Sequence, residues 1–266
     1  MPFVTASVIA LGLIPTMQTP ARASRGLPAI RLASHFRGLE GCFLLRDLKN
    51  GWTLSWGEPR CEQRLSPCST FKIFNALAGL ESGVLVDEHT RFAYDGTPQP
   101  VKVWQQDHTL ASAIQNSVVW YFRRVAQGVG EERMAKFLHD VGYGNEACRG
   151  RLTDFWIDGT LEISPREQLE FLTRLYSDRL PFQRAHMALV RRLLVQRASG
   201  DWSWSGKTGT QGRDNQMVMG WFVGQVRSGP REFVFVTNIA ASHDAGGRQA
   251  REITWDILKE MRLVRD

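Results

Sequence analysis

The chain has 266 residues, of which 43% are hydrophobic, so it is long enough to bury a substantial core. Its formal net charge is +6, but lysine and arginine are spread along the chain, which argues against a nucleic-acid partner. No stretch reaches the roughly 18 consecutive apolar residues of a membrane-spanning helix, so we expect no stable membrane anchor.

The N-terminus is typical of an export signal. An apolar run at Val4–Met17 precedes the small-x-small sequence ARA at 21–23, although no basic residue comes before Arg22. We predict a signal peptide over residues 1–23, a mature chain that begins near Ser24, and a periplasmic location. The alternative interpretation is a disordered start.

The first half of the mature chain contains a hairpin signal and a helix signal. Two apolar runs within residues 41–57 meet at Asn50-Gly51, which is the strongest short signal for a hairpin. Residues 69–82 follow a helical pattern that ends before Gly83, a typical residue after a helix C-terminus.

The second half begins with helices and ends with strands and one more helix. The segment 164–177 predicts a helix, because Ser164 and Glu167 have the spacing of a capping box and Pro165 fits the first turn. Strands are predicted for three short aromatic and β-branched segments: WSWSGKTGT, QMVMGWFVGQV and REFVFVTNIA. Residues 251–264 predict a final amphipathic helix.

Strands from both ends of the chain and helices from its middle predict an α/β (α+β) fold. We expect a largely antiparallel sheet flanked by helices, with sheet segments at about 24–68 and 197–266. A helical domain at about 69–196 is inserted between them, and residues 24–266 form a single catalytic unit.

The cysteines and histidines favour neither a metal site nor a redox motif. The four cysteines form no C-x-x-C pair, and the six histidines lack ligand spacing, so we predict no metal. Cys42 and Cys61 flank the predicted hairpin and are a candidate disulfide if the protein is exported. Cys68 is interpreted as a small packed residue.

The sequence Ser69-Thr70-Phe71-Lys72 carries the strongest chemical signal. Residues i and i+3 of a helix share one face, so Lys72 would lie beside the hydroxyl of Ser69 and could act as its base. The start of a helix also supplies N–H groups that stabilise an oxyanion. The S-x-x-K pattern by itself is weak, and a surface lysine would be the usual explanation.

Three further motifs follow in a fixed order after Ser69–Lys72: Ser117–Val119, Tyr143–Asn145 and Lys207–Gly209. This set resembles the serine penicillin-recognising enzymes, which carry S-x-x-K, a second serine motif and K-T-G. The S-T-F-K, S-x-V, Y-G-N and K-T-G variants resemble those of the class D β-lactamases, the oxacillinases, from about residue 41 into the last helix. In this comparison Tyr143–Asn145 looks structural.

The resemblance implies an unusual modification of Lys72. In this family CO2, or bicarbonate as its source, carboxylates the lysine to a carbamate that serves as general base, and no separate cofactor is needed. Burial favours the neutral amine that reacts, and Phe71, Ile73 and Val119 would keep Lys72 dry. Trp156 matches the family tryptophan that hydrogen-bonds the carbamate.

The resemblance also assigns the acylation step. Ser69 attacks the lactam carbonyl, and its N–H and that of Thr210 form the oxyanion hole. Ser117 relays a proton to the lactam nitrogen with help from Lys207.

The substrate carboxylate would bind to the K-T-G segment. Lys207, Thr208 and Gly209 line that position, and an arginine near the last helix completes it. Arg248 fits this role best, and Arg251 stays an alternative.

The implied function is hydrolysis of β-lactams by a serine β-lactamase of class D, with a small-molecule substrate. The alternatives are a non-hydrolytic β-lactam sensor domain and a penicillin-binding transpeptidase. Substrate range is expected to depend on loop shape near Trp104, Gln211 and Trp221.

Overall fold

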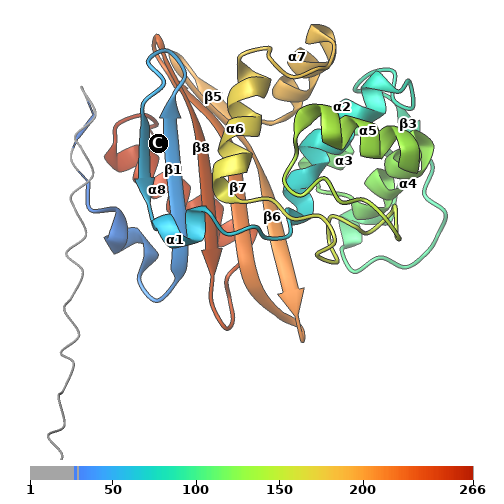
Figure 1. Ribbon diagram of the computed structural model, residues 1–266, viewed down its shortest axis with the longest axis horizontal. Coiled ribbons are helices and arrows are strands. Elements are labelled where there is room, and N and C mark those ends of the chain that lie inside the picture. Colours follow the sequence, from blue (N-terminus) through green and yellow to red (C-terminus); the bar gives the residue numbers. More distant parts are fainter. Residues whose placement is uncertain (1–26, 29, 266) are drawn as a thin grey trace, which may run out of the picture.

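The computed structural model describes residues 27–28 and 30–265, so the predicted signal peptide and its cleavage site lie outside the described residues. Within them, strands from both ends of the chain form one antiparallel sheet in the order β2-β1-β8-β7-β6-β5 (Figure 1). The predicted fold class is therefore confirmed. The six strands are β1 (Glu40–Asp47), β2 (Thr53–Trp56), β5 (Val195–Ser199), β6 (Trp202–Arg213), β7 (Gln216–Ser228) and β8 (Arg231–Ala240).

Helices occupy most of the middle of the chain. The α-helices are α1 (Glu58–Cys61), α2 (Lys72–Glu81), α3 (Leu110–Gln115), α4 (Val119–Val129), α5 (Glu131–Val141), α6 (Pro165–Tyr176), α7 (Arg184–Leu193) and α8 (Gly247–Glu260). The shorter elements are the 3₁₀ helices η1 (Leu32–Phe36), η2 (Cys68–Phe71) and η3 (Lys102–Trp104) and the paired strands β3 (Arg91–Phe92) and β4 (His108–Thr109).

The predicted hairpin joins β1 to β2. The Asp47 carboxylate accepts hydrogen bonds from the backbone N–H groups of Lys49 and Asn50, both at 2.8 Å. Gly51 has a φ of 72°, in the left-handed region that glycine adopts without a steric cost. The turn is therefore built as the sequence predicted.

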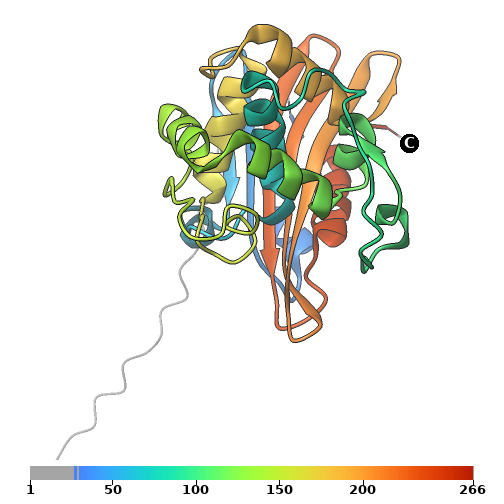
Figure 2. The same ribbon diagram turned by 90° about the vertical axis from the view of Figure 1, so that its right-hand side faces the viewer.

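Helices cover both faces of the sheet (Figures 1 and 2). On β8, Phe233 and Phe235 belong to the core beneath α8, whereas Val234 and Val236 belong to the core shared with the other helices. This alternation follows from the two-residue period of a strand, which sends successive side chains to opposite faces. The sheet therefore separates two hydrophobic cores.

Helix α6 has the predicted cap and packs against the sheet next to β1 and β8. The Ser164 hydroxyl accepts from the Glu167 N–H at 3.2 Å, and the Glu167 carboxylate accepts from the Ser164 N–H at 2.8 Å. Helix α8 corrects the predicted range 251–264, because it begins at Gly247 and ends at Glu260. This first turn was not predicted from the sequence, because two adjacent glycines lie at its start and glycine has a low helix propensity.

The candidate disulfide is present: Cys42 of β1 is bonded to Cys61 of α1. Cys68 is free and buried, as expected. No helix among the described residues is long and apolar enough to cross a membrane.

Candidate active site

The first part of the site is the short turn that leads into α2. Ser69 is partly exposed in η2, whereas Lys72, the first residue of α2, is completely buried. Lys72 Nζ lies 2.6 Å from Ser69 Oγ, so the pair expected from the i, i+3 spacing is within hydrogen-bond distance. Cys68 holds a φ of 49°, which is costly for a residue with a Cβ and is typical of a functional turn.

The surroundings of Lys72 favour its neutral form. Burial lowers the pKa of Lys72 well below its ordinary value, and the positive charges of Lys207 and Arg123 lower it further. Phe71 is fully buried next to it, and the Phe122 ring centroid lies 5.9 Å from its Nζ. An uncharged amine beside a serine hydroxyl can accept the proton of that hydroxyl or react as a nucleophile itself.

A second serine–lysine pair comes from a different part of the chain. Lys207 Nζ on β6 donates to Ser117 Oγ at 2.9 Å and to the Thr208 carbonyl at 3.0 Å. Burial lowers the pKa of Lys207 to about 7. Ser117 precedes α4 and has a φ of 54°, another strained backbone position. Lys207 can therefore exchange a proton near neutral pH.

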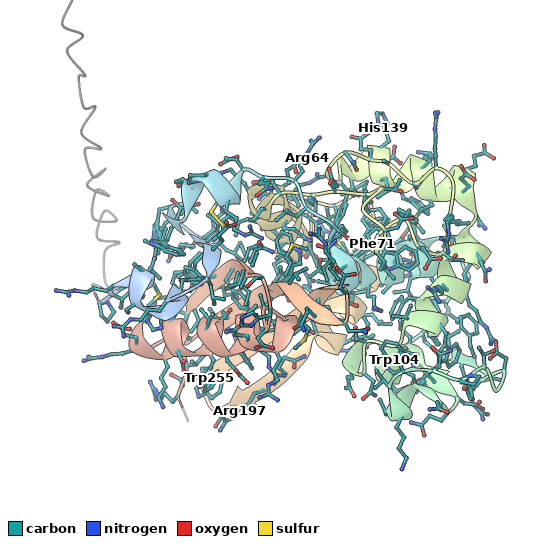
Figure 3. The ribbon with its side chains drawn as sticks, turned by 90° about the horizontal axis from the view of Figure 1, so that it is seen from below. Arg64, Phe71, Trp104, His139, Arg197 and Trp255 are labelled. Carbon is teal, nitrogen blue, oxygen red and sulfur yellow. A yellow bond between two sulfur atoms is a disulfide. The ribbon has the colours of Figure 1, made fainter. Side chains whose placement is uncertain are left out.

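The K-T-G strand approaches the Ser69 turn closely, and glycine makes this possible. A Cβ added at Gly209 would lie 3.0 Å from the Pro67 carbonyl oxygen and 3.2 Å from Cγ2 of Thr70. Figure 3 shows Phe71, at the end of this turn, between the sheet and the helices. Backbone packing at Gly209 therefore sets the separation of the two serine–lysine pairs.

Trp156 has the property expected of a ligand-binding donor. Its side chain is fully buried, stacks on Phe71 with ring centroids 5.4 Å apart, and leaves Nε1 without a hydrogen-bond partner. Its carbonyl accepts from the Ser66 hydroxyl at 3.0 Å, and the Ser66 carbonyl accepts from Trp221 Nε1 at 3.0 Å. A buried N–H without a partner is uncommon in proteins, so this donor is available to an acceptor at the site.

The Y-G-N residues make structural contacts. Gln168 donates to the buried Tyr143 hydroxyl, and Gly144 faces the Glu162 carbonyl at a distance that would exclude a Cβ. Asn145 Oδ1 accepts from the Glu162 N–H at 3.0 Å. These contacts hold the base of the loop that carries Trp156.

The residues expected to bind a carboxylate lie around the start of α8. Thr210 is exposed, and its hydroxyl accepts from the Gly247 N–H at 2.9 Å, which places Arg248 one residue away. The Arg248 side chain is 85% exposed and pairs with Glu252 at 3.0 Å, whereas Arg251 is partly buried. Because this ion pair is exposed to solvent, Arg248 can exchange Glu252 for the carboxylate of a ligand.

The three residues expected to shape the entrance differ in exposure. Trp104 and Gln211 are partly exposed, and Figure 3 places Trp104 on the helical side of the molecule. Trp221 is completely buried and its Nε1 donates to the Ser66 carbonyl, so any influence on substrate range would act through the segments packed around it. Val119, the first residue of α4, is half-buried.

Two charged residues near the site were not expected from the sequence. Arg123 and Asp154 form an ion pair although 31 residues separate them, and no local pattern could have linked them. Within the described part of the chain, no group of three or more His, Cys, Asp or Glu side chains could hold a metal ion.

Together, these elements place two serine–lysine pairs between an antiparallel sheet and a helical layer, as in the serine penicillin-recognising proteins. The sequence pattern of the penicillin binding protein transpeptidase domain family matches residues 41–259. The chain belongs to this family, and within it to the class D β-lactamases.

Individual relatives support the narrower assignment. The probable beta-lactamase YbxI of Bacillus subtilis (strain 168) is 40% identical over 229 residues, which are 86% of this chain and 84% of the relative. The crystal structure of a class D β-lactamase from Bacillus subtilis is similar, with a TM-score of 0.85 and 39% identity, covering 89% of this chain and 98% of the other.

A regulatory protein is also related. The regulatory protein BlaR1 of Bacillus licheniformis is 33% identical over 223 residues, which are 84% of this chain but only 37% of that protein.

Proposed function

We propose that this protein hydrolyses β-lactams through an acyl-enzyme on Ser69, with N-carboxylated Lys72 as the general base. The observation that carries the proposal is the fully buried Lys72, whose Nζ lies 2.6 Å from Ser69 Oγ. The similarity to class D β-lactamases supports the β-lactam as substrate.

Two features of the site fit a carbamate on Lys72. The lowered pKa of Lys72, caused first by burial, favours the neutral amine that reacts with CO2. Trp156 Nε1 is a buried donor without a partner and would satisfy one carbamate oxygen. The carbamate would supply a base for both acylation and deacylation.

We assign to the remaining residues the roles that the family resemblance implies. Ser69 Oγ attacks the lactam carbonyl, and the N–H groups of Ser69 and Thr210 bind the oxyanion. Ser117 carries a proton to the lactam nitrogen, and Lys207 replaces it, because a lysine with a pKa of about 7 gives up and regains a proton near neutrality. Thr208 and Arg248 bind the substrate carboxylate.

A sensor role is the second candidate, because the C-terminal domain of the BlaR penicillin-receptor of Bacillus licheniformis shares the fold, with a TM-score of 0.84 at 31% identity. A sensor or a transpeptidase would also form the Ser69 ester, and the three functions differ in what happens to that ester. An enzyme of this class needs a base that activates water, and Lys72 lies beside the ester oxygen.

We also propose that the protein is exported, with the mature chain beginning near Ser24. The disulfide between Cys42 and Cys61 supports an oxidising compartment.

The test is multiple-turnover hydrolysis of a simple penicillin, with and without bicarbonate, combined with intact-mass analysis. We expect many turnovers per protein, a rate that rises with bicarbonate, no adduct in Ser69→Ala, and little turnover in Lys72→Ala. A single adduct on Ser69 that persists would mean a sensor or a transpeptidase. Full turnover by Lys72→Ala would refute the role of the carbamate.

A further inference from the structure

The orientation of Trp156 depends on a segment without regular secondary structure. Residues 142–163, between α5 and α6, form turns and irregular chain with one isolated β-bridge from Ile163 to Leu65. The indole ring is held by stacking on Phe71 and by the Ser66 bond to its carbonyl, but neither contact involves Nε1. The direction of this donor is therefore set by the packing of the ring together with the backbone of the turn that carries it.

Asp154 organises that turn, two residues before Trp156. Its N–H donates to the Arg151 carbonyl at 2.9 Å, and its own carbonyl accepts from Ile157 and Asp158 at 2.7 and 3.0 Å. Its carboxylate is almost buried, and one oxygen accepts from Thr153 at 3.0 Å. The side chain and the backbone of Asp154 thus hold the turn from both sides of the tryptophan.

The other carboxylate oxygen of Asp154 binds Arg123 of α4. Burial by itself would raise the pKa of Asp154, but the hydrogen bonds from Arg123 and Thr153 and the charges of Arg123 and Arg151 lower it below its ordinary value. The carboxylate therefore stays ionised. Because α4 follows Ser117 directly, the ion pair ties the turn to the helix that begins beside the second serine motif.

Arg123 also acts on Lys72 through its charge. Its guanidinium is close enough to contribute to the lowered pKa of Lys72, after burial and Lys207. A cation at this position disfavours an ammonium and favours an anion at the same place. Charge therefore links this ion pair to Lys72, and geometry links it to the turn that carries Trp156.

We propose that Arg123 and Asp154 are positioning residues that raise the affinity of Lys72 for CO2, an inference that rests on the carbamate of the proposed function. In the step concerned, the lone pair of the neutral Nζ attacks the carbon of CO2 and forms an N–C bond. One C=O electron pair moves to oxygen, and the nitrogen proton leaves to solvent, so no oxidant or reductant is needed. The ion pair holds Trp156 where its N–H donates to the new carbamate oxygen.

The test measures CO2 affinity directly and not only through turnover. Purified protein depleted of CO2 is titrated with ¹³C-labelled bicarbonate, and the carbamate signal is followed by NMR, alongside hydrolysis at each concentration. We expect Arg123→Gln and Asp154→Asn to need about tenfold more bicarbonate for half-saturation, as for other losses of supporting hydrogen bonds at a reactive ligand. At saturating bicarbonate, kcat should return close to that of the unchanged protein.

Two further variants serve as controls. Arg124→Gln removes the neighbouring arginine of α4, which pairs with Asp95, and should leave half-saturation unchanged. Arg123→Lys keeps the positive charge and one donor nitrogen, so its half-saturation should lie at a lower bicarbonate concentration than that of Arg123→Gln. This partial recovery would distinguish a loss of positioning from a general folding defect.

The outcomes separate this inference from the proposed function. A carbamate signal with the same half-saturation in the unchanged protein, Arg123→Gln and Asp154→Asn would overturn the positioning role and leave the proposed function intact. No carbamate signal in the unchanged protein would overturn both. A reduced kcat that bicarbonate does not restore would also contradict the inference, because it would place the ion pair in a step other than carboxylation.

Discussion

Replacing Lys207 by methionine should abolish rapid hydrolysis and yet make the folded protein more stable at neutral pH. Methionine keeps the length and apolar stem of the side chain, whereas the buried amine is removed. Lys207 is 4% exposed, and burial lowers the pKa of its amine from 10.5 to about 7. Burying this amine therefore lowers the free energy of unfolding, and the methionine variant lacks that penalty.

The magnitude follows from the pKa difference between the folded and unfolded states. A shift from 10.5 to about 7, at about 1.4 kcal/mol per unit, corresponds to a cost of about 5 kcal/mol below pH 7, where both states are protonated. Lys207 also donates to Ser117 and to the Thr208 carbonyl, and losing these bonds costs about 1 kcal/mol each. The expected net gain in the free energy of unfolding is about 3 kcal/mol.

The pH dependence provides the sharper test. Above pH 10.5 the amine is neutral in both states, and the burial cost disappears. As the pH falls from there toward 7, the unfolded chain binds a proton that the folded protein does not, so the cost grows; below pH 7 both states are protonated and it stays constant. The advantage of Lys207→Met should therefore be largest at and below pH 7.

Urea unfolding at several pH values, in buffers depleted of CO2, measures this difference, and the exposed Lys49→Met is the matched control. A variant that is less stable than the unchanged protein at pH 7, or a difference independent of pH, would refute the reasoning.

Two other predictions concern the disulfide and the carboxylate site. The double variant Cys42→Ala/Cys61→Ala opens a loop of 19 residues in sequence separation, and its free energy of unfolding should fall by about 3 kcal/mol; no loss in thermal or urea unfolding would contradict this. Arg248→Ala should raise KM for a penicillin about tenfold with little change in kcat, as expected for a lost bond to a charged group, whereas Arg251→Ala should not. Steady-state kinetics measures both values. A raised KM in Arg251→Ala and not in Arg248→Ala would make Arg251 the residue that binds the substrate carboxylate.

The local features of the sequence predicted their own structures well. The Asn50-Gly51 turn, the Ser164–Glu167 cap and the i, i+3 pair of Ser69 and Lys72 depend on neighbours within four residues. Propensity, capping and helical spacing decide such features, so they can be read from a short window. The start of α8 was predicted wrongly, because its first turn is held by the contact of Gly247 with β6, a distant strand.

The sequence by itself therefore determined the chemical groups, the order of the motifs and the class of fold. Only the tertiary structure decided that burial lowers the pKa of Lys72, that Lys207 reaches Ser117, and that Trp156 has a donor without a partner. Burial and charge at one point depend on every segment packed around it. The pair of Arg123 and Asp154 shows the same limit, because two side chains from separate parts of the chain meet only after the helices have packed.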